Sequence, residues 1–207
     1  MRVLIFGDSI TQGFWDTNGG WIQRIRTVYD KETIKTGYDL PTIFNLSISG
    51  NSSRDIVERF EAETKARCQD EELGFIFAVG LNDSRTKSGV NFSEPEEYKS
   101  NLEKLLVMAS RYSNKIVFVG LTPCVEERSN PVSWSNTGYT NDRIRMFNQV
   151  LEVFCHDNAL EFIDILTPFT EAEAKTELLP DSLHPNNEGH RIIADIVMPR
   201  LKSIFRE

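Results

Sequence analysis

The chain has 207 residues, enough for one α/β domain with a sizeable core. Hydrophobic residues make up 40 % and charged residues 26 % of it, a balance that argues against disordered and membrane-embedded classes. The formal net charge of −8 repels phosphate backbones, so we expect no nucleic acid among the partners.

Short apolar runs alternate with longer amphipathic stretches along the chain, which is typical of βαβ units and a parallel sheet. Five runs rich in Val, Ile and Phe are predicted strands, covered on both faces: residues 3–6, 43–46, 75–79, 116–121 and 161–165. Helical stripes of apolar residues lie between and after them, around Ile25, Ile56, Leu105, Phe147 and Ile193. Pro199 predicts a break or kink in the last helix.

The overall organisation is that of one unit. We find no internal repeat, low-complexity tract or interdomain linker, so we expect residues 1–207 to form a single domain. No apolar run approaches the length that spans a bilayer. The opening strand leaves no room before it for a signal peptide, and widely spaced Cys68, Cys124 and Cys155 suit reduced thiols. These features predict a cytoplasmic protein.

One connection, residues 123–141, is unusually long for a compact domain. It contains turn-forming residues and two large aromatics, Trp134 and Tyr139. Connections of this length usually either cover a site or move freely on the surface. Two interpretations stay open, a lid or pocket wall and a mobile surface excursion.

The first chemical signal is Gly7-Asp8-Ser9, placed where the first strand ends. In an open parallel sheet, ligands bind outside the carboxyl ends of the strands. A serine on a tight turn there is presented to solvent, and backbone N–H groups of the following helical turn can hold an oxyanion. Taken alone, a serine in such a turn is more often a helix N-cap than a nucleophile.

The second signal is Asp181-Ser182-Leu183-His184-Pro185, just ahead of the last helix. A serine hydroxyl is a poor nucleophile and needs a base to accept its proton. Histidine can serve as that base, and a carboxylate on its other nitrogen fixes its tautomer and orientation. The alternative for an isolated D-x-x-H is a capping Asp beside a surface His.

Two further segments follow predicted strands and therefore lie at the same edge as Ser9. They are Gly50 and the sequence Gly80-Leu81-Asn82-Asp83. Glycine lets the backbone approach a substrate closely, and an asparagine amide can donate to a developing oxyanion. Each segment alone is equally consistent with an ordinary turn.

In combination, these four blocks resemble the SGNH hydrolases (GDSL-like esterases and lipases), a family named after the Ser, Gly, Asn and His of its blocks. Gly-Asp-Ser, G-x-N-D and D-x-x-H-P match without substitution, whereas the Gly50 block matches more loosely. The resemblance implies a flavodoxin-like, three-layer α/β/α sandwich around a five-stranded parallel sheet of strand order 2-1-3-4-5. It also implies a serine esterase that works through an acyl-enzyme intermediate.

The same resemblance implies a role for each matching residue. Ser9 is the expected nucleophile, His184 the base and Asp181 the orienting carboxylate. The expected oxyanion donors are the backbone N–H groups of Ser9 and Gly50 and the side chain of Asn82. Two further residues, Asp8 and Asp83, are expected to brace the turns.

The substrate is less clearly indicated. The aromatic residues next to the site loops are Phe14, Trp15, Trp21, Trp134 and Tyr139, and we expect Trp21 to belong to the core and the other four to the pocket. Indole faces suit a sugar ring as well as a short acyl group. We therefore expect small-molecule esters of short, acetyl-like acyl groups, with carbohydrate as the candidate alcohol part. A lysophospholipase or thioesterase of the same family is the alternative.

Two other functional classes were weighed. A metal-dependent phosphoesterase would need several carboxylates and imidazoles converging on its ions, but the chain has three histidines. Two of these, His156 and His190, fall in predicted helices and are interpreted as structural. We therefore expect neither metal nor cofactor. A non-catalytic binding module with the same fold is the other alternative.

Overall fold

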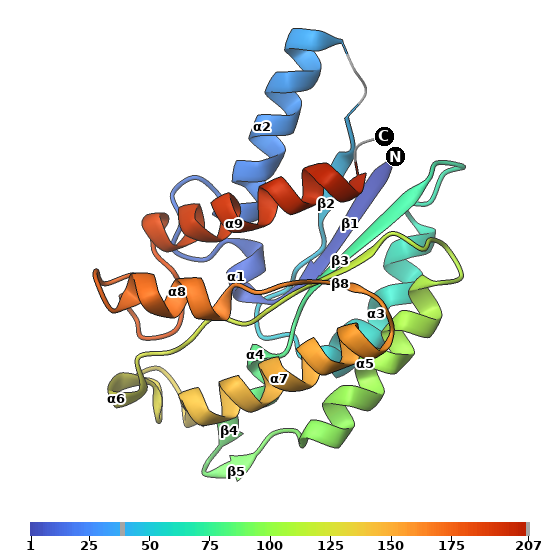
Figure 1. The fold of residues 1–207 in the computed structure, drawn as a ribbon. Coiled ribbons are helices and arrows are strands. Elements are labelled where there is room, and N and C mark those ends of the chain that lie inside the picture. The colour runs from blue at the N-terminus through green and yellow to red at the C-terminus, as the bar shows by residue number, and fades with distance from the viewer. Residues whose placement is uncertain (38–39, 206–207) are drawn as a thin grey trace.

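The computed structural model describes residues 1–37 and 40–205. Its central sheet contains five parallel strands in the order β2-β1-β3-β6-β8 (Figure 1). They are β1 (Arg2–Gly7), β2 (Thr42–Asn45), β3 (Leu73–Ala78), β6 (Ile116–Val119) and β8 (Glu161–Ile163). Counted along the chain among themselves, these strands have the order 2-1-3-4-5, so the predicted fold class is confirmed.

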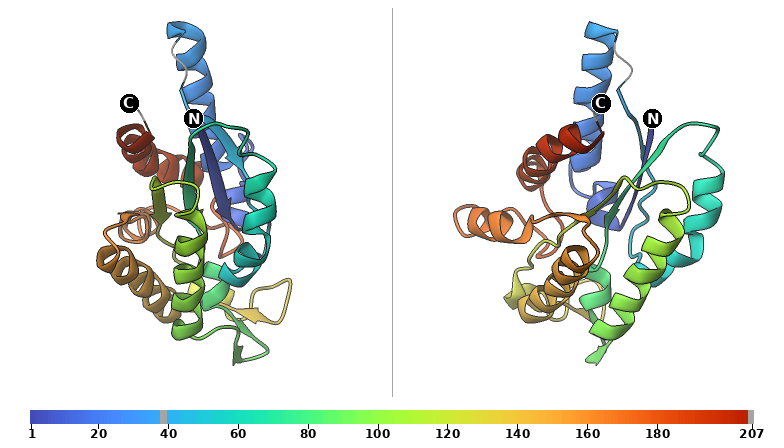
Figure 2. Two further views of the ribbon diagram at one scale, coloured as in Figure 1. Left: turned by 90° about the vertical axis from the view of Figure 1, so that its right-hand side faces the viewer. Right: turned by 45° about the vertical axis from the view of Figure 1, so that its right-hand side comes forward.

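Helices cover both faces of the sheet (Figures 1 and 2). Helix α2 (Gly20–Thr36) packs against α9 (Asn187–Phe205) on one face, and α3 (Ser53–Lys65), α5 (Pro95–Ala109) and α7 (Asn141–Asp157) pack side by side on the other. The right-handed rule for crossovers explains this division. Helix α2 leads from β1 towards one edge of the sheet, whereas α3, α5 and α7 lead in the opposite direction.

The strands are apolar because both faces are covered. Phe6, Phe75 and Phe77 are fully buried, and their rings pack with those of Phe60 and Phe118. Continuous burial of this kind removes the alternation of polar and apolar residues that a one-sided sheet shows. Each strand can therefore end abruptly in a polar turn at the carboxyl edge, where the candidate site lies.

For the last helix, a break or a kink was expected at Pro199. A break is wrong, because α9 continues through this residue to Phe205. Proline costs a helix one backbone hydrogen bond, but Val197, Leu201 and Phe205 on both sides of it are buried. We attribute the continuity of the helix to this packing.

Several short elements were not predicted. They are α1 (Ser9–Gln12), α4 (Leu81–Ser84), α6 (Glu126–Ser129), α8 (Leu166–Glu173) and a small antiparallel sheet of β4 (Thr86–Lys87), β5 (Val90–Asn91) and β7 (Thr137–Gly138). The three cysteines are free thiols, and Cys124 and Cys155 are buried. Among the helices of the described residues, none has the length and apolarity needed to cross a membrane.

Candidate active site

Ser9 is held at the carboxyl end of the first strand by a compact turn. The Asp8 side chain caps α1, accepting a hydrogen bond of 3.0 Å from the backbone N–H of Ile10. A Cβ atom on Gly7 would lie 2.6 Å from the side chain of Thr11, so only glycine lets the turn close this tightly. Ser9 is thus the first residue of a short helix that begins directly at the edge of the sheet.

A continuous chain of hydrogen bonds joins Ser9 to the segment before α9. Ser9 Oγ lies 2.8 Å from His184 Nε2, and His184 Nδ1 lies 2.7 Å from Asp181 Oδ2. The other carboxylate oxygen, Oδ1, accepts the backbone N–H groups of Leu183 and His184 at 3.0 and 2.7 Å. With the proton on Nδ1, the Nε2 atom of His184 is free to accept the proton of Ser9.

The Asp181 carboxylate is strongly stabilised in its ionised form. Burial opposes ionisation, but hydrogen bonds from the side chain and backbone of His184, from Leu183 and from Trp15 outweigh it and hold the pKa of Asp181 well below its usual range. An aspartate that remains charged can orient an imidazole and stabilise its protonated form.

Three aromatic rings surround His184. Ring centroids of Phe14, Trp15 and Trp134 lie 5.7, 6.4 and 5.9 Å from the imidazole centroid. Trp15 also donates its indole N–H to Asp181 Oδ2 at 2.6 Å. The Trp15 backbone has a φ of 65°, which is uncommon for a bulky residue. A strained, exposed tryptophan bonded to the carboxylate was not foreseen from the sequence.

The Gly50 loop approaches Ser9 from the next strand. Two hydrogen bonds fix it against the first turn, from Ile48 N to Gly7 O at 3.1 Å and from Ser49 N to Gln12 Oε1 at 2.8 Å. Gly50 itself has a φ of 80°, and a Cβ atom there would meet no neighbour within 4 Å. The backbone conformation, rather than lack of space, therefore favours glycine at this position.

The amide of Asn82 is oriented by two donors. Its Oδ1 atom accepts hydrogen bonds from the Tyr139 hydroxyl at 2.9 Å and from Arg85 Nη1 at 3.0 Å. The Nδ2 atom donates to the backbone oxygen of Asn51 at 3.1 Å. Because both neighbours of Oδ1 are donors, the amide cannot flip without losing them, and its Nδ2 atom also donates to Asp8 Oδ2 at 3.4 Å.

The two aspartates predicted as braces are buried and bonded within the turns. Burial raises the pKa of Asp8 to about 6, against the opposing effect of the Ile10 N–H. Burial also raises the pKa of Asp83 to about 6, although both of its oxygens accept hydrogen bonds from Ser53 at the start of α3. Asp83 thereby ties α3 to the turn that carries Asn82.

The candidate active site contains a pocket of about 180 Å³. Of the predicted site residues, the pocket brings together Ser9, Gly50, Asn82, Trp134, Tyr139 and His184. The 123–141 connection therefore forms one wall. Phe14 and Trp15 do not line the pocket but contact His184, and Trp21 is in the core with 1 % of its surface exposed.

Several lining residues were not predicted: Ser49, Leu81, Arg85, Val132, Ser135, Thr137 and Leu183. Arg85 could have been found, because it lies three residues after Asn82 on the same turn. The others had no distinguishing local signal, since they reach the pocket only through the folding of their loops.

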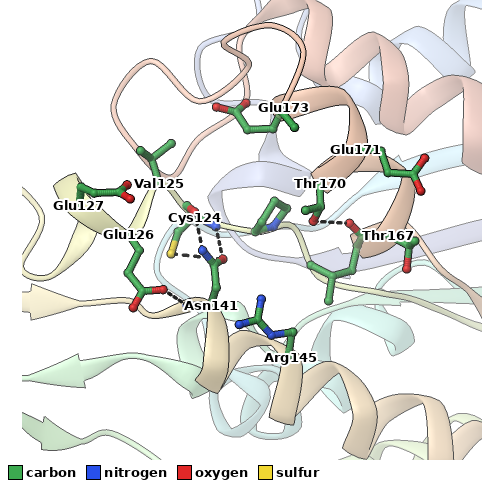
Figure 3. A pocket seen from close by; sticks show the side chains of 13 residues that line it. Cys124, Val125, Glu126, Glu127, Asn141, Arg145, Thr167, Thr170, Glu171 and Glu173 are labelled. Carbon is green, nitrogen blue, oxygen red and sulfur yellow. Dashed lines mark hydrogen bonds between the residues drawn. The ribbon is translucent and has the colours of Figure 1, made fainter.

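A larger hollow of about 990 Å³ lies beside α6, α7 and α8 (Figure 3). Its lining includes Cys124, Glu126, Arg145 and Glu173, and none of the predicted site residues. Burial raises the pKa of the Cys124 thiol, which disfavours the reactive thiolate. Size alone therefore does not identify the candidate active site.

The remaining histidines lie outside the pocket lining. His156 is exposed at the end of α7. His190 is buried, with Nε2 donating to the backbone oxygen of Phe14 at 2.8 Å and Nδ1 accepting from Trp21 N at 3.3 Å. Burial lowers the pKa of His190, which favours this neutral form. Across residues 1–37 and 40–205, no three His, Cys, Asp or Glu side chains gather in a way that could hold a metal ion.

Comparison with known proteins shows to which family the chain belongs. The chain matches the model of the GDSL-like lipase/acylhydrolase family over residues 5–192. Its fold is similar to that of a lipase/acylhydrolase from Enterococcus faecalis, with a TM-score of 0.77 and 18 % identity over 98 % of this chain and 95 % of that one. It is also similar to that of a lipolytic protein of the G-D-S-L family from Veillonella parvula, with a TM-score of 0.75 and 19 % identity over 96 % of this chain and 97 % of that one. A third similar structure is an acetylxylan esterase from Geobacillus stearothermophilus, with a TM-score of 0.76 and 19 % identity over 100 % of this chain and 94 % of that one. No curated protein sequence gave a significant match.

Proposed function

Since this chain belongs to the GDSL-like lipase/acylhydrolase family and is a carboxylic ester hydrolase, as its motifs predicted, we propose that Ser9 is its nucleophile, His184 its general base and Asp181 the orienting carboxylate. The observation that carries this proposal is the hydrogen-bonded chain from Ser9 Oγ through both nitrogens of His184 to Asp181. Nucleophile, base and orienting group are the three parts that acyl transfer to serine requires.

The reaction proceeds in two halves. Ser9 Oγ attacks the acyl carbon while its proton moves to His184 Nε2, and the resulting imidazolium then protonates the departing alcohol. This leaves the acyl group bound to Ser9 as an ester. Water attacks that ester with His184 again accepting the proton, and the carboxylic acid leaves as Ser9 recovers its hydroxyl hydrogen.

The negative charge of each tetrahedral intermediate needs donors fixed in advance. We assign this role to the backbone N–H groups of Ser9 and Gly50 and to Nδ2 of Asn82. The anchoring of the Gly50 loop to Gly7 and Gln12 supports the assignment, as do the two donors that orient the Asn82 amide. Donors held by their neighbours do not have to reorganise when the charge appears.

The substrate we propose has a short acyl group, of acetyl size, on a carbohydrate alcohol. A pocket of about 180 Å³ leaves little room for a long chain, and its lining includes hydroxyl groups of Ser49, Ser135 and Thr137. The exposed indole of Trp134 beside His184 offers a face for a sugar ring. A lysophospholipase or thioesterase would need a longer apolar groove next to Ser9.

We also propose a cytoplasmic location. Three unpaired thiols, two of them buried, suit a reducing compartment. Fractionation of the producing cell with an antibody against the protein tests this, and recovery outside the cytoplasm contradicts it.

The decisive experiment is hydrolysis of a chromogenic acetyl ester by the wild-type protein and by Ser9→Ala, both with a chelator present. We expect full wild-type activity and loss of activity in Ser9→Ala. Ser203→Ala is the matched control, because in the described part of the chain the exposed Ser203 hydroxyl donates to Arg200 O within α9 and does not line the pocket. Equal rates for Ser9→Ala and wild type contradict the serine mechanism, and loss of wild-type activity with chelator favours the metal-dependent alternative.

A further inference from the structure

The pocket beside Ser9 contains a permanent positive charge that the ester chemistry does not use. Arg85 follows α4 and lines the same pocket as Ser9 and His184. Its Nη1 atom donates to the backbone oxygen of Gly50 at 3.2 Å and to Asn82 Oδ1 at 3.0 Å, and its guanidinium carbon lies 3.9 Å from the centroid of the Phe92 ring. The guanidinium is thus held in a fixed place, but by neutral partners.

No carboxylate pairs directly with this guanidinium in the described part of the chain. Other arginines do have such partners, for example Arg24 with Asp16 and Arg67 with Glu63. Asp83 is near enough for the charge of Arg85 to favour its ionised form, but its oxygens accept hydrogen bonds from Ser53 instead. Among the described residues, two hydrogen bonds start from Nη1, and the Tyr139 hydroxyl is a further neutral neighbour, so part of the five N–H groups of Arg85 remains for another acceptor.

The rest of the pocket matches this charge. Within residues 1–37 and 40–205, none of the side chains that line it is an aspartate or a glutamate. Hydroxyl groups of Ser49, Ser135 and Thr137 add further donors. In a protein of net charge −8, an arginine with no acidic side chain beside it in the pocket lining can attract and orient an anion.

We propose that Arg85 makes the enzyme selective for esters that carry an anionic oxygen group, a carboxylate, sulfate or phosphate, close to the bond that is cleaved. This inference rests on the proposed function and adds the charge of the substrate to it. A guanidinium presents a planar fork of donors that fits such a group better than it fits a neutral ester. The anionic group can belong to the acyl part or to the alcohol part of the substrate.

A purely structural role for Arg85 gives a different expectation. If Arg85 only held Asn82 and Gly50 in place, its removal would slow neutral and anionic esters by the same factor. The ratio of kcat/KM for an anionic ester to that for a neutral ester of the same size cancels this effect. This ratio therefore distinguishes a role of Arg85 in selecting anionic substrates from a role in positioning the oxyanion donors.

The test uses two pairs of substrates and two proteins. For the acyl part, the pair is the monoaryl ester of glutaric acid and the aryl ester of pentanoic acid. For the alcohol part, it is an O-acetylated methyl glucuronide and the corresponding methyl glucoside. We expect the wild type to prefer the anionic member of one pair by about ten- to hundredfold, the contribution typical of a charge-assisted hydrogen bond, and Arg85→Met to reduce this ratio to about one.

Three results would overturn the inference: a ratio near one in both pairs for the wild type, a preference that survives in Arg85→Met, or equal affinities of Ser9→Ala for both members of each pair by calorimetry. The last measurement needs no turnover. If Arg85→Met does not fold, Arg85→Gln replaces it in the same kinetic measurements. Failure of the serine mechanism is recognised separately, because Ser9→Ala then hydrolyses the neutral esters.

Discussion

The indole N–H of Trp15 donates to the same oxygen of Asp181 that receives His184 Nδ1, at 2.6 and 2.7 Å. The loop that carries Trp15 is tied to α9 and α2 from several sides. Thr17 N donates to Asn187 Oδ1 at 3.0 Å, and Asp16 pairs with Arg24 at 2.8 Å. These ties hold the strained backbone of Trp15, so that the indole is in position before substrate arrives.

We expect Trp15→Phe to reduce kcat about tenfold with little change in KM. The ring contact with His184 is kept, but the hydrogen bond to Asp181, of the charge-assisted kind, is lost. Steady-state kinetics measure both parameters.

Trp134→Phe is the matched control for this prediction. Trp134 also packs on His184, with centroids 5.9 Å apart, but no hydrogen bond joins it to Asp181. Its replacement should leave kcat in place, even if KM for a sugar ester rises. An unchanged kcat in Trp15→Phe would show that the indole hydrogen bond does not act on the catalytic base.

Asn82→Ala should lower kcat by about 10²–10³, the effect of removing one oxyanion donor. The side chain makes no contact with the Ser9–His184–Asp181 chain in the present hydrogen-bond pattern, so labelling of Ser9 by a phosphonate should persist, although more slowly. A loss of kcat below threefold would make Asn82 a turn residue.

Tyr139→Phe should have a smaller effect, about two- to tenfold on kcat. One neutral hydrogen bond to Asn82 Oδ1 disappears, but the one from Arg85 still orients the amide. Tyr112→Phe is the control, because that hydroxyl bonds to Glu61 instead of to a site residue. A loss as large as that of Asn82→Ala would mean that Tyr139 contacts the reacting groups directly.

Stability should depend on pH through the buried Asp8. Because burial raises its folded-state pKa from 3.8 to about 6, the folded protein binds this proton more tightly than the unfolded chain. The stability associated with Asp8 is therefore complete below about pH 4 and is lost as the pH rises through about 6. Asp8→Asn cannot ionise, so its free energy of unfolding relative to wild type should rise by about 2 kcal/mol from pH 4 to pH 7. Urea unfolding at both pH values measures this difference.

Asp16→Asn should show the opposite sign, in urea unfolding carried from pH 4 down to pH 2. Burial opposes ionisation of Asp16, but hydrogen bonds, first that from Arg24, lower its pKa to about 2. Its stabilising effect is present above about pH 4 and is lost as the pH falls towards 2. If both variants changed in the same direction with pH, burial would not be the cause of the Asp8 effect.

Much of the fold followed from local patterns. Hydrophobic runs located the five strands, because a strand covered on both faces must be apolar throughout. The polar turns after β1 and β3 were then assigned to one edge, since parallel strands all end there. Asp181 and His184 could be paired because a turn of three residues brings them together without help from the rest of the chain.

Only the tertiary structure decided how the supporting side chains meet. Trp15 and Asp181 are 166 positions apart, and Tyr139 and Asn82 are 57 positions apart. Contacts across such separations depend on how irregular loops fold over one another, and loops carry no periodic pattern from which this can be predicted. The sequence therefore determined which groups could perform the chemistry, whereas the packing of the loops decided that Phe14 and Trp15 contact His184 from outside the pocket and that Arg85 lines it.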